Sequence, residues 1–273
     1  MIEGVRKKLL KNLIITLVIG AFLEILLLGF LNNENYIIIA TLILFITIGI
    51  ASSFSSKYKN FYKNEIIKPL FEKYSLTYDP DMGLDENLAL SSGLLPEYDE
   101  YNSSDLIKGE GFEAANVTLY RYRRSTDRED REVKETLFSG MMVVTKSERD
   151  VKTPFLIKNN SFYLCKVLPF CADKERQRLD DNEFEKYFDV FGGDMVEVRE
   201  ILTHNIMESL VNLKKLINLS EISLIGKMRF ATLERFSLFL IPSIFKKFDE
   251  NSLRISERNI QNLLNLVNFL KKL

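Results

Sequence analysis

The clearest pattern along the chain is a pair of long apolar runs near its start, separated by a short polar turn. The first run covers Leu13 to Leu31, the second covers Tyr36 to Phe54, and Asn32 to Asn35 lie between them. At about 1.5 Å per residue each run gives roughly 28 Å of helix, close to the thickness of the hydrocarbon core of a bilayer. We therefore predict a transmembrane helical hairpin over residues 1–56, with helices at about 13–31 and 36–54.

Positive charge on both flanks predicts the orientation of this hairpin. Lysine and arginine stay on the cytoplasmic side of short spans, so both termini are expected in the cytoplasm. A cleaved signal peptide is the alternative, but the first run is long, and FLNNEN after Gly29 does not resemble a small-residue cleavage site. The polar turn has no basic residue. Those before the first run and after the second are Arg6, Lys7, Lys8, Lys11, Lys57, Lys59, Lys63 and Lys68.

The remaining residues, 57–273, are predicted to form one cytoplasmic α+β domain. Asn116 to Arg124 and Val133 to Lys146 are rich in β-branched and aromatic residues, and the charged STDREDRE between them indicates a hairpin with a solvated tip. Further strands are predicted at 155–158 (FLIK), 161–168 (SFYLCKVL) and 185–191 (EKYFDVF), with a second hairpin formed by 220–233 and 236–242 (FSLFLIP).

Two helices are predicted in the second half of this domain. Thr203 is suited to cap a helix from about His204 to Leu216, and Ser256 to cap a C-terminal helix at about 256–273. Strands that precede and follow single helices, without regular βαβ alternation, indicate an antiparallel sheet with flanking helices.

Composition narrows the classes of function. A net charge of −1 argues against a dedicated nucleic-acid binder, so we expect no nucleic-acid partner. Cys165 and Cys171 are the two cysteines, no C-x-x-C spacing occurs, and His204 is the one histidine. These residues predict neither a zinc site nor a disulfide framework. No motif for a cofactor, a metal or a catalytic group is recognised, and none is expected.

Several segments together resemble a known family. They are FYKNEIIKPLFEKY, the stretch from Tyr78 to Glu110 that contains SSGLLPEYDEYNSSD, LFSGMMVV, and the stretch from Glu183 to Lys215 that contains FEKYFDVFGGDMVEVREILTHNIME. The chain is similar, from about Phe61 to Leu240, to the bacterial membrane-anchored proteins known as domain of unknown function 3137. This resemblance implies a transmembrane pair ahead of the domain and a place in the bacterial inner membrane, and it leaves the activity open.

We expect structural and not catalytic roles for the residues that depart from that family and for the weak motifs of the chain. His204 stands where the family tends to have proline, so we expect it to fill the start of a helix rather than to act in catalysis. The family's longer basic segment is shortened here to TKSERDVKTPF. Asp79 to Glu86 resembles a calcium loop, but Gly83 stands one place too early, and a turn before a helix is favoured. The segment from Tyr98 to Tyr101 is either a contact patch or an exposed loop.

Glu24 is the candidate residue inside the membrane hairpin. A charged side chain near the middle of a transmembrane helix costs on the order of 2–3 kcal/mol and should face another helix. Thr41 and Thr47 on the second helix are its available polar neighbours, and Gly20 allows close approach. Packing or assembly is favoured over ion translocation, because a single carboxyl in two helices makes a poor pathway.

Two functions remain open. The favoured one is a membrane-anchored interaction or scaffold protein whose domain binds a protein or lipid partner, or a second copy, at the cytoplasmic face. The alternative is a transport accessory or a small-molecule enzyme with a site built from dispersed residues. A pocket of converging acids favours the enzyme, whereas a filled core with an exposed apolar or aromatic patch favours the interaction protein.

Overall fold

The computed structural model describes residues 2–30, 35–124, 132–160 and 176–273, apart from the side chains of residues 28–30 and 35–37. The chain divides into two compact units. Unit 1 contains Met1–Leu70 and Phe239–Ser256, and unit 2 contains Phe71–Leu238 and Glu257–Leu273. Each unit is therefore built from two separate stretches of the chain.

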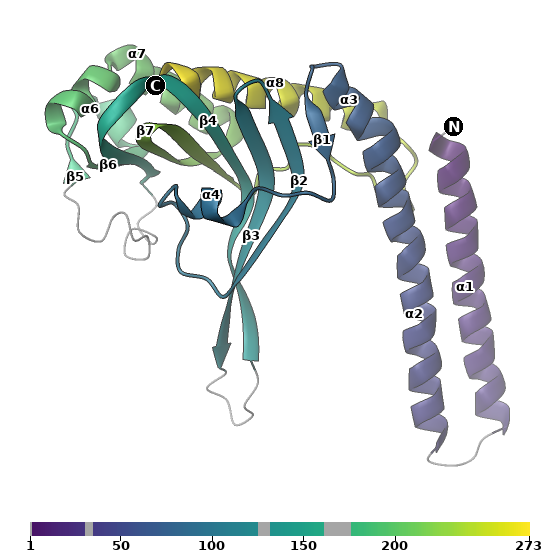
Figure 1. Cartoon of the computed structure of the whole chain (residues 1–273). Helices are drawn as coiled ribbons and strands as arrows, with labels where there is room; N and C mark the ends of the chain where they lie inside the picture. Colours follow the sequence, from purple (N-terminus) through teal and green to yellow (C-terminus); the bar gives the residue numbers. More distant parts are fainter. Residues whose placement is uncertain (1, 31–34, 125–131, 161–175) are drawn as a thin grey trace. The chain divides into compact units, whose positions relative to one another are not determined.

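Unit 1 is centred on two long helices, α1 (Ile2–Phe30) and α2 (Asn35–Tyr62), which lie side by side (Figure 1). Both are long and apolar enough to cross a membrane. A π-helical turn, η1 (Lys63–Ile67), and α3 (Lys68–Glu72) continue α2. The backbone N–H of Lys68 bonds the carbonyl of Lys63 in this turn. Pro69 follows directly and has no N–H to donate, which accounts for a break in the regular bonding at this point.

Unit 2 contains an antiparallel sheet, as the sequence predicts. The strands follow the order β1-β2-β3-β4-β6-β5, and β7 pairs with β4. Strand β4 is long enough to pair with β3 along its first half, with β6 along its last residues, and with β7 along its other edge. The strands are β1 (Thr77–Asp79), β2 (Glu100–Gly109), β3 (Phe112–Arg124), β4 (Glu132–Asn159), β5 (Arg176–Gln177), β6 (Phe188–Gly192) and β7 (Leu219–Glu234).

The predicted hairpin of β3 and β4 is confirmed. Residues 155–158 also lie in a strand, as predicted, but they are the end of β4 and not a strand of their own. The prediction of a second hairpin is wrong. Residues 236–242 form no strand and no second hairpin. Strand β7 ends at Glu234, and Arg235 has a left-handed backbone with φ of 52°. Leu238 packs in the core, at 1% exposure, without belonging to a strand, so burial alone accounts for an apolar residue at this position. The predicted strand at 161–168 lies outside the described residues.

Helices cover both faces of the sheet. Figure 1 shows α4 (Glu86–Leu90) on one face and α7 (His204–Ile217) with α8 (Glu250–Lys272) on the other. Two short helices, α5 (Asn182–Glu185) and α6 (Met195–Ile201), lie between strands. The prediction that Ser256 caps the last helix is wrong: α8 begins at Glu250, and the Ser256 hydroxyl bonds the carbonyl of Ser252 inside the helix.

Candidate functional site

A hollow of about 650 Å³ in unit 2 is formed by the tyrosine-rich acidic segment together with β3. The segment leaves α4 through a tight turn in which the Ser92 hydroxyl donates to the Ala89 carbonyl and accepts from the N–H of Leu94. This turn buries Leu94 and Leu95 in the core, and the residues that follow lie beside β3, where the Asp99 N–H donates to the Tyr120 carbonyl. We call the hollow the Tyr98 pocket; it is lined by Leu90, Leu95, Pro96, Glu97, Tyr98, Asp99, Arg121 and Tyr122.

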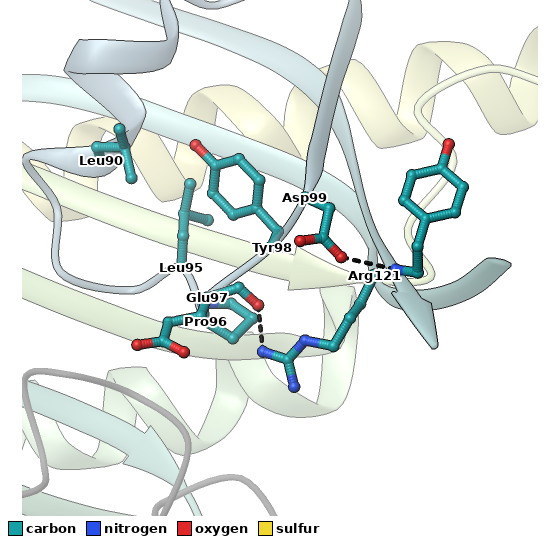
Figure 2. A pocket seen from close by; sticks show the side chains of 8 residues that line it. Leu90, Leu95, Pro96, Glu97, Tyr98, Asp99 and Arg121 are labelled. Atoms are coloured by element: carbon teal, nitrogen blue, oxygen red, sulfur yellow. Dashed lines mark hydrogen bonds between the residues drawn. The ribbon is translucent and has the colours of Figure 1, made fainter. Parts of the chain in front are cut away.

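Figure 2 shows how the polar groups of the Tyr98 pocket are held. The Arg121 guanidinium donates to the main-chain oxygen of Glu97, and the Asp99 carboxylate accepts the backbone N–H of Tyr122 at 2.7 Å. The Tyr98 hydroxyl donates to Glu86 at 2.8 Å. Burial and this hydrogen bond together raise the pKa of Tyr98. The tyrosine is therefore neutral at physiological pH and serves as a donor, not as a base.

A cluster of polar groups on β2, β3 and β4 adjoins the pocket through Tyr122. Glu100 accepts from the Lys134 ammonium at 2.8 and 3.0 Å, from the Tyr122 hydroxyl and from Asn102. These donors, Lys134 foremost, lower the pKa of Glu100 to about 2. The Lys134 ammonium also lies 3.8 Å from the centroid of the Tyr120 ring. The hydrogen bond to Glu100 holds the Tyr122 side chain in place at the rim of the pocket.

The pocket combines apolar surface with an excess of negative charge. Leu90 is 48% exposed and Tyr122 is 41% exposed, so apolar and aromatic surface faces solvent. Glu97 and Asp99 outnumber the one cation, Arg121, among the lining residues. An apolar floor with a net negative rim suits an aliphatic or aromatic side chain next to a basic one. The arrangement is thus suited to binding rather than to an acid and base exchanging protons.

A buried ion pair is the feature that sequence reading missed. Lys158 on β4 and Glu221 on β7 are cross-strand partners 4.0 Å apart, with side chains 4% and 8% exposed. Glu221 also accepts from the Thr232 hydroxyl at 3.0 Å, whereas the Lys158 ammonium has no hydrogen-bond partner among the described residues. Burial raises the pKa of Glu221. The signal was present, since Lys158 directly follows the apolar residues FLI and Glu221 stands between the apolar residues of LSEISLIG.

The other candidates from the sequence are the histidine, the calcium-like loop and the cysteines, and the first two do not come together in one site among the described residues. His204 begins α7, as predicted, and its ring nitrogen Nδ1 lies 2.9 Å from Asp181, the residue that caps α5. Its side chain is 79% exposed. Asp79 closes a turn by accepting two backbone N–H groups, and Asp85 caps α4, so the turn-then-helix prediction is confirmed. Cys165, Cys171 and most of STDREDRE lie outside the described residues.

Among the membrane-helix candidates, Thr47 lies directly against α1. A Cβ built on Gly20 would meet the side chain of Thr47 at 2.4 Å, so the glycine lets the two helices approach closely. Glu24 follows one turn later on the same face of α1 and is half-buried. The Thr41 side chain is exposed.

The family model for a group described as "Protein of unknown function (DUF3137)" matches residues 136–272, half of this chain. The chain belongs to this family. The DUF3137 match runs from β4 to the end of α8, so it includes the buried Lys158 and Glu221 pair. The Tyr98 pocket lies ahead of the matched residues. No curated protein matches the chain in sequence.

Comparison with solved structures finds a distant likeness for this DUF3137 member. The crystal structure of the mycobacterial trehalose monomycolate transport factor A, TtfA, aligns with a TM-score of 0.35 and 6% sequence identity. The alignment covers 74% of this chain and 93% of that one. Similarity at this level does not indicate what the present chain binds.

Proposed function

We propose that this chain is a membrane-anchored interaction protein. In this proposal, α1 and α2 cross the inner membrane of a bacterial cell with both ends in the cytoplasm, and unit 2 holds a protein partner at the inner face through the Tyr98 pocket. The observation that carries the proposal is the exposed apolar and aromatic surface of this pocket over a filled core. The pocket's excess of carboxylates favours a partner segment with an apolar side chain beside a lysine or arginine.

Arg121 and Leu90 provide the test of this pocket. A photo-crosslinking amino acid at Leu90, in the full chain in its native membrane, should form an adduct with one protein. Introducing Arg121→Ala removes the guanidinium that holds the main chain of Glu97 and so releases one wall of the pocket; adduct formation should fall by about tenfold or more, the effect of losing a contact of 1.4 kcal/mol or above.

The matched control is Arg124→Ala, at an exposed position farther along β3 and outside the pocket. It should leave the adduct unchanged. Equal loss with both variants would show that overall charge, and not the pocket, governs capture. The same crosslinker placed at Val196, which is 66% exposed on α6, gives the background level of labelling. If labelling from Leu90 is no stronger than this background, the Tyr98 pocket does not bind the partner.

The proposal assigns the Gly20 and Glu24 face of α1 to packing between helices. Gly20→Leu should push α1 and α2 apart, because the new side chain meets Thr47, and overpacking of this kind costs about 1–3 kcal/mol. Gly49→Leu is the control, since no atom lies within 4 Å of a Cβ at that glycine. Spin-label distances between the helices in vesicles measure the separation. Glu24→Gln should keep the native distance, and a proton flux that is lost in Glu24→Gln would instead indicate transport.

A further inference from the structure

The stretch from Phe239 to Asp249 returns to unit 1 and is fastened to the ends of α1 and α2. Arg6 near the start of α1 is 5% exposed, and its Nη1 donates to the Ile244 carbonyl at 2.9 Å. The Phe248 ring lies 6.4 Å from the ring of Tyr62, which ends α2. We call residues 239–249 the return segment.

The return segment has an inner side and an outer side. Ile244 is 2% exposed and Phe248 is half-buried, so these residues form its attachment. Phe245 is 65% exposed, and Lys246 and Lys247 are exposed next to it. An outward phenylalanine beside two outward lysines is costly to leave in water and typical of segments that lie at a membrane surface.

The attachment point lies close to the expected edge of the bilayer. Arg6 precedes the apolar run that starts at Leu13 by about 10 Å of helix. A headgroup layer is roughly 5–8 Å thick on each side, and charges act over a Debye length of about 8–10 Å. The attachment point therefore lies just outside the headgroup layer and within reach of its charge, provided that α1 and α2 cross the membrane as the proposed function states.

Charge at this level is predominantly positive. The acids of unit 1 outside its apolar runs and the turn between them are Glu65, Asp249, Glu250 and Glu3, the last of which is already paired with Arg6. The exposed lysines of the neighbouring helix ends and of the return segment itself are Lys7, Lys8, Lys11, Lys57, Lys59, Lys246 and Lys247. Clusters of this kind next to a transmembrane helix attract anionic headgroups.

We propose that the return segment is a binding site for anionic phospholipid, in which Phe245 inserts among the headgroups and Lys246 and Lys247 contact their phosphates. The site is built from opposite ends of the sequence. It selects the lipid that surrounds the helices of this chain, and it is separate from the Tyr98 pocket.

The chain contains no tryptophan, so Phe245→Trp provides a unique fluorescent reporter. The full chain carrying this change is reconstituted in phosphatidylcholine vesicles that contain brominated phosphatidylglycerol or brominated phosphatidylcholine, whose bromines quench nearby tryptophan. Quenching should be stronger with the anionic lipid. Adding Lys246→Gln or Lys247→Gln should reduce that preference by roughly fivefold for each lysine removed.

Phe22→Trp is the control for membrane insertion, because Phe22 lies within the first apolar run and is 60% exposed. If neither reporter is quenched, the chain does not cross the bilayer and the proposed function itself fails. If Phe22→Trp is quenched and Phe245→Trp is not, the chain crosses the membrane but the return segment does not touch lipid. Equal quenching of Phe245→Trp by both lipids, unchanged without the lysines, would overturn the selectivity for anionic headgroups.

Discussion

Lys158→Met should lower the free energy of unfolding of unit 2 by about 3–5 kcal/mol, because it leaves the carboxyl of Glu221 buried without its cross-strand cation. Glu221 would keep the Thr232 hydroxyl as a donor, but one neutral hydrogen bond does not replace the attraction of an ammonium group. The double variant Lys158→Met with Glu221→Leu should recover most of the loss, since an apolar pair of similar volume suits this site. Urea denaturation of the detergent-solubilised chain, followed by tyrosine fluorescence, measures these changes.

Lys108 and Glu113 provide a matched control for the buried pair. They are also cross-strand partners, and their atoms are closer, at 2.8 Å, but their side chains are 52% and 35% exposed. Lys108→Met should therefore cost less than about 1 kcal/mol, because water screens the pair and solvates the glutamate that remains. Equal costs for Lys108→Met and Lys158→Met would contradict the importance of burial.

The cost of Lys158→Met should also depend on pH. Burial already raises the pKa of Glu221 above its ordinary value of 4.5, and loss of the lysine charge should raise it further. A carboxyl whose pKa is raised in the folded state stabilises the fold below its unfolded pKa, and this contribution is lost as the pH rises through the folded pKa. The Lys158→Met variant should accordingly be closer to the wild type at about pH 5 than at about pH 8.

Arg229→Met should destabilise unit 2 by about 2–5 kcal/mol. Arg229 is 0% exposed, and its guanidinium donates to the carbonyls of Gly226 and Met228 on β7, of Arg149 on β4 and of Leu273 after α8. Removing it takes a donor from four buried or part-buried main-chain oxygens, and each one left unpaired away from water costs about 1–3 kcal/mol before relaxation. Arg229→Lys should recover little, since one ammonium cannot reach groups that a planar fork spans.

Arg149→Met is the matched control for Arg229. The Arg149 side chain is 41% exposed and lies 3.5 Å from Glu200, so its removal should change stability by less than about 1 kcal/mol. Hydrogen exchange of the amides around Gly226 reports the local effect. Faster exchange should be confined to Arg229→Met, and unchanged protection there would show that the carbonyls find other donors.

Features that depend on local sequence were predictable from the chain. The apolar runs indicate α1 and α2, and the alternation on either side of STDREDRE indicates the hairpin of β3 and β4. The helix beginning at His204 also matches α7, although Thr203 makes no side-chain capping bond. In each case the pattern needs no knowledge of which distant segment packs against it.

Features that depend on distant contacts were not predictable in the same way. Strand β4 has two edges with different partners, and no periodicity in residues 132–159 indicates that FLIK belongs to the same strand as GMMVV. Residues 236–242 look like a strand because burial and strand formation both select apolar residues. The Tyr98 pocket was noticed as a tyrosine-rich acidic segment, but Arg121, which completes it, comes from another strand.

Unit 1 is built from two distant stretches of the chain, and this affects the order in which the protein can fold during synthesis. A ribosome releases α1 and α2 long before Ile244 exists, so Arg6 has to wait for its carbonyl acceptor until Phe71–Leu238 has been translated. Domains fold as units during synthesis, and the greater part of unit 2 is then complete before unit 1. A nascent chain stalled before Phe239 would lack the return segment, and the Arg6 guanidinium, which is buried in the finished unit, would be exposed to water.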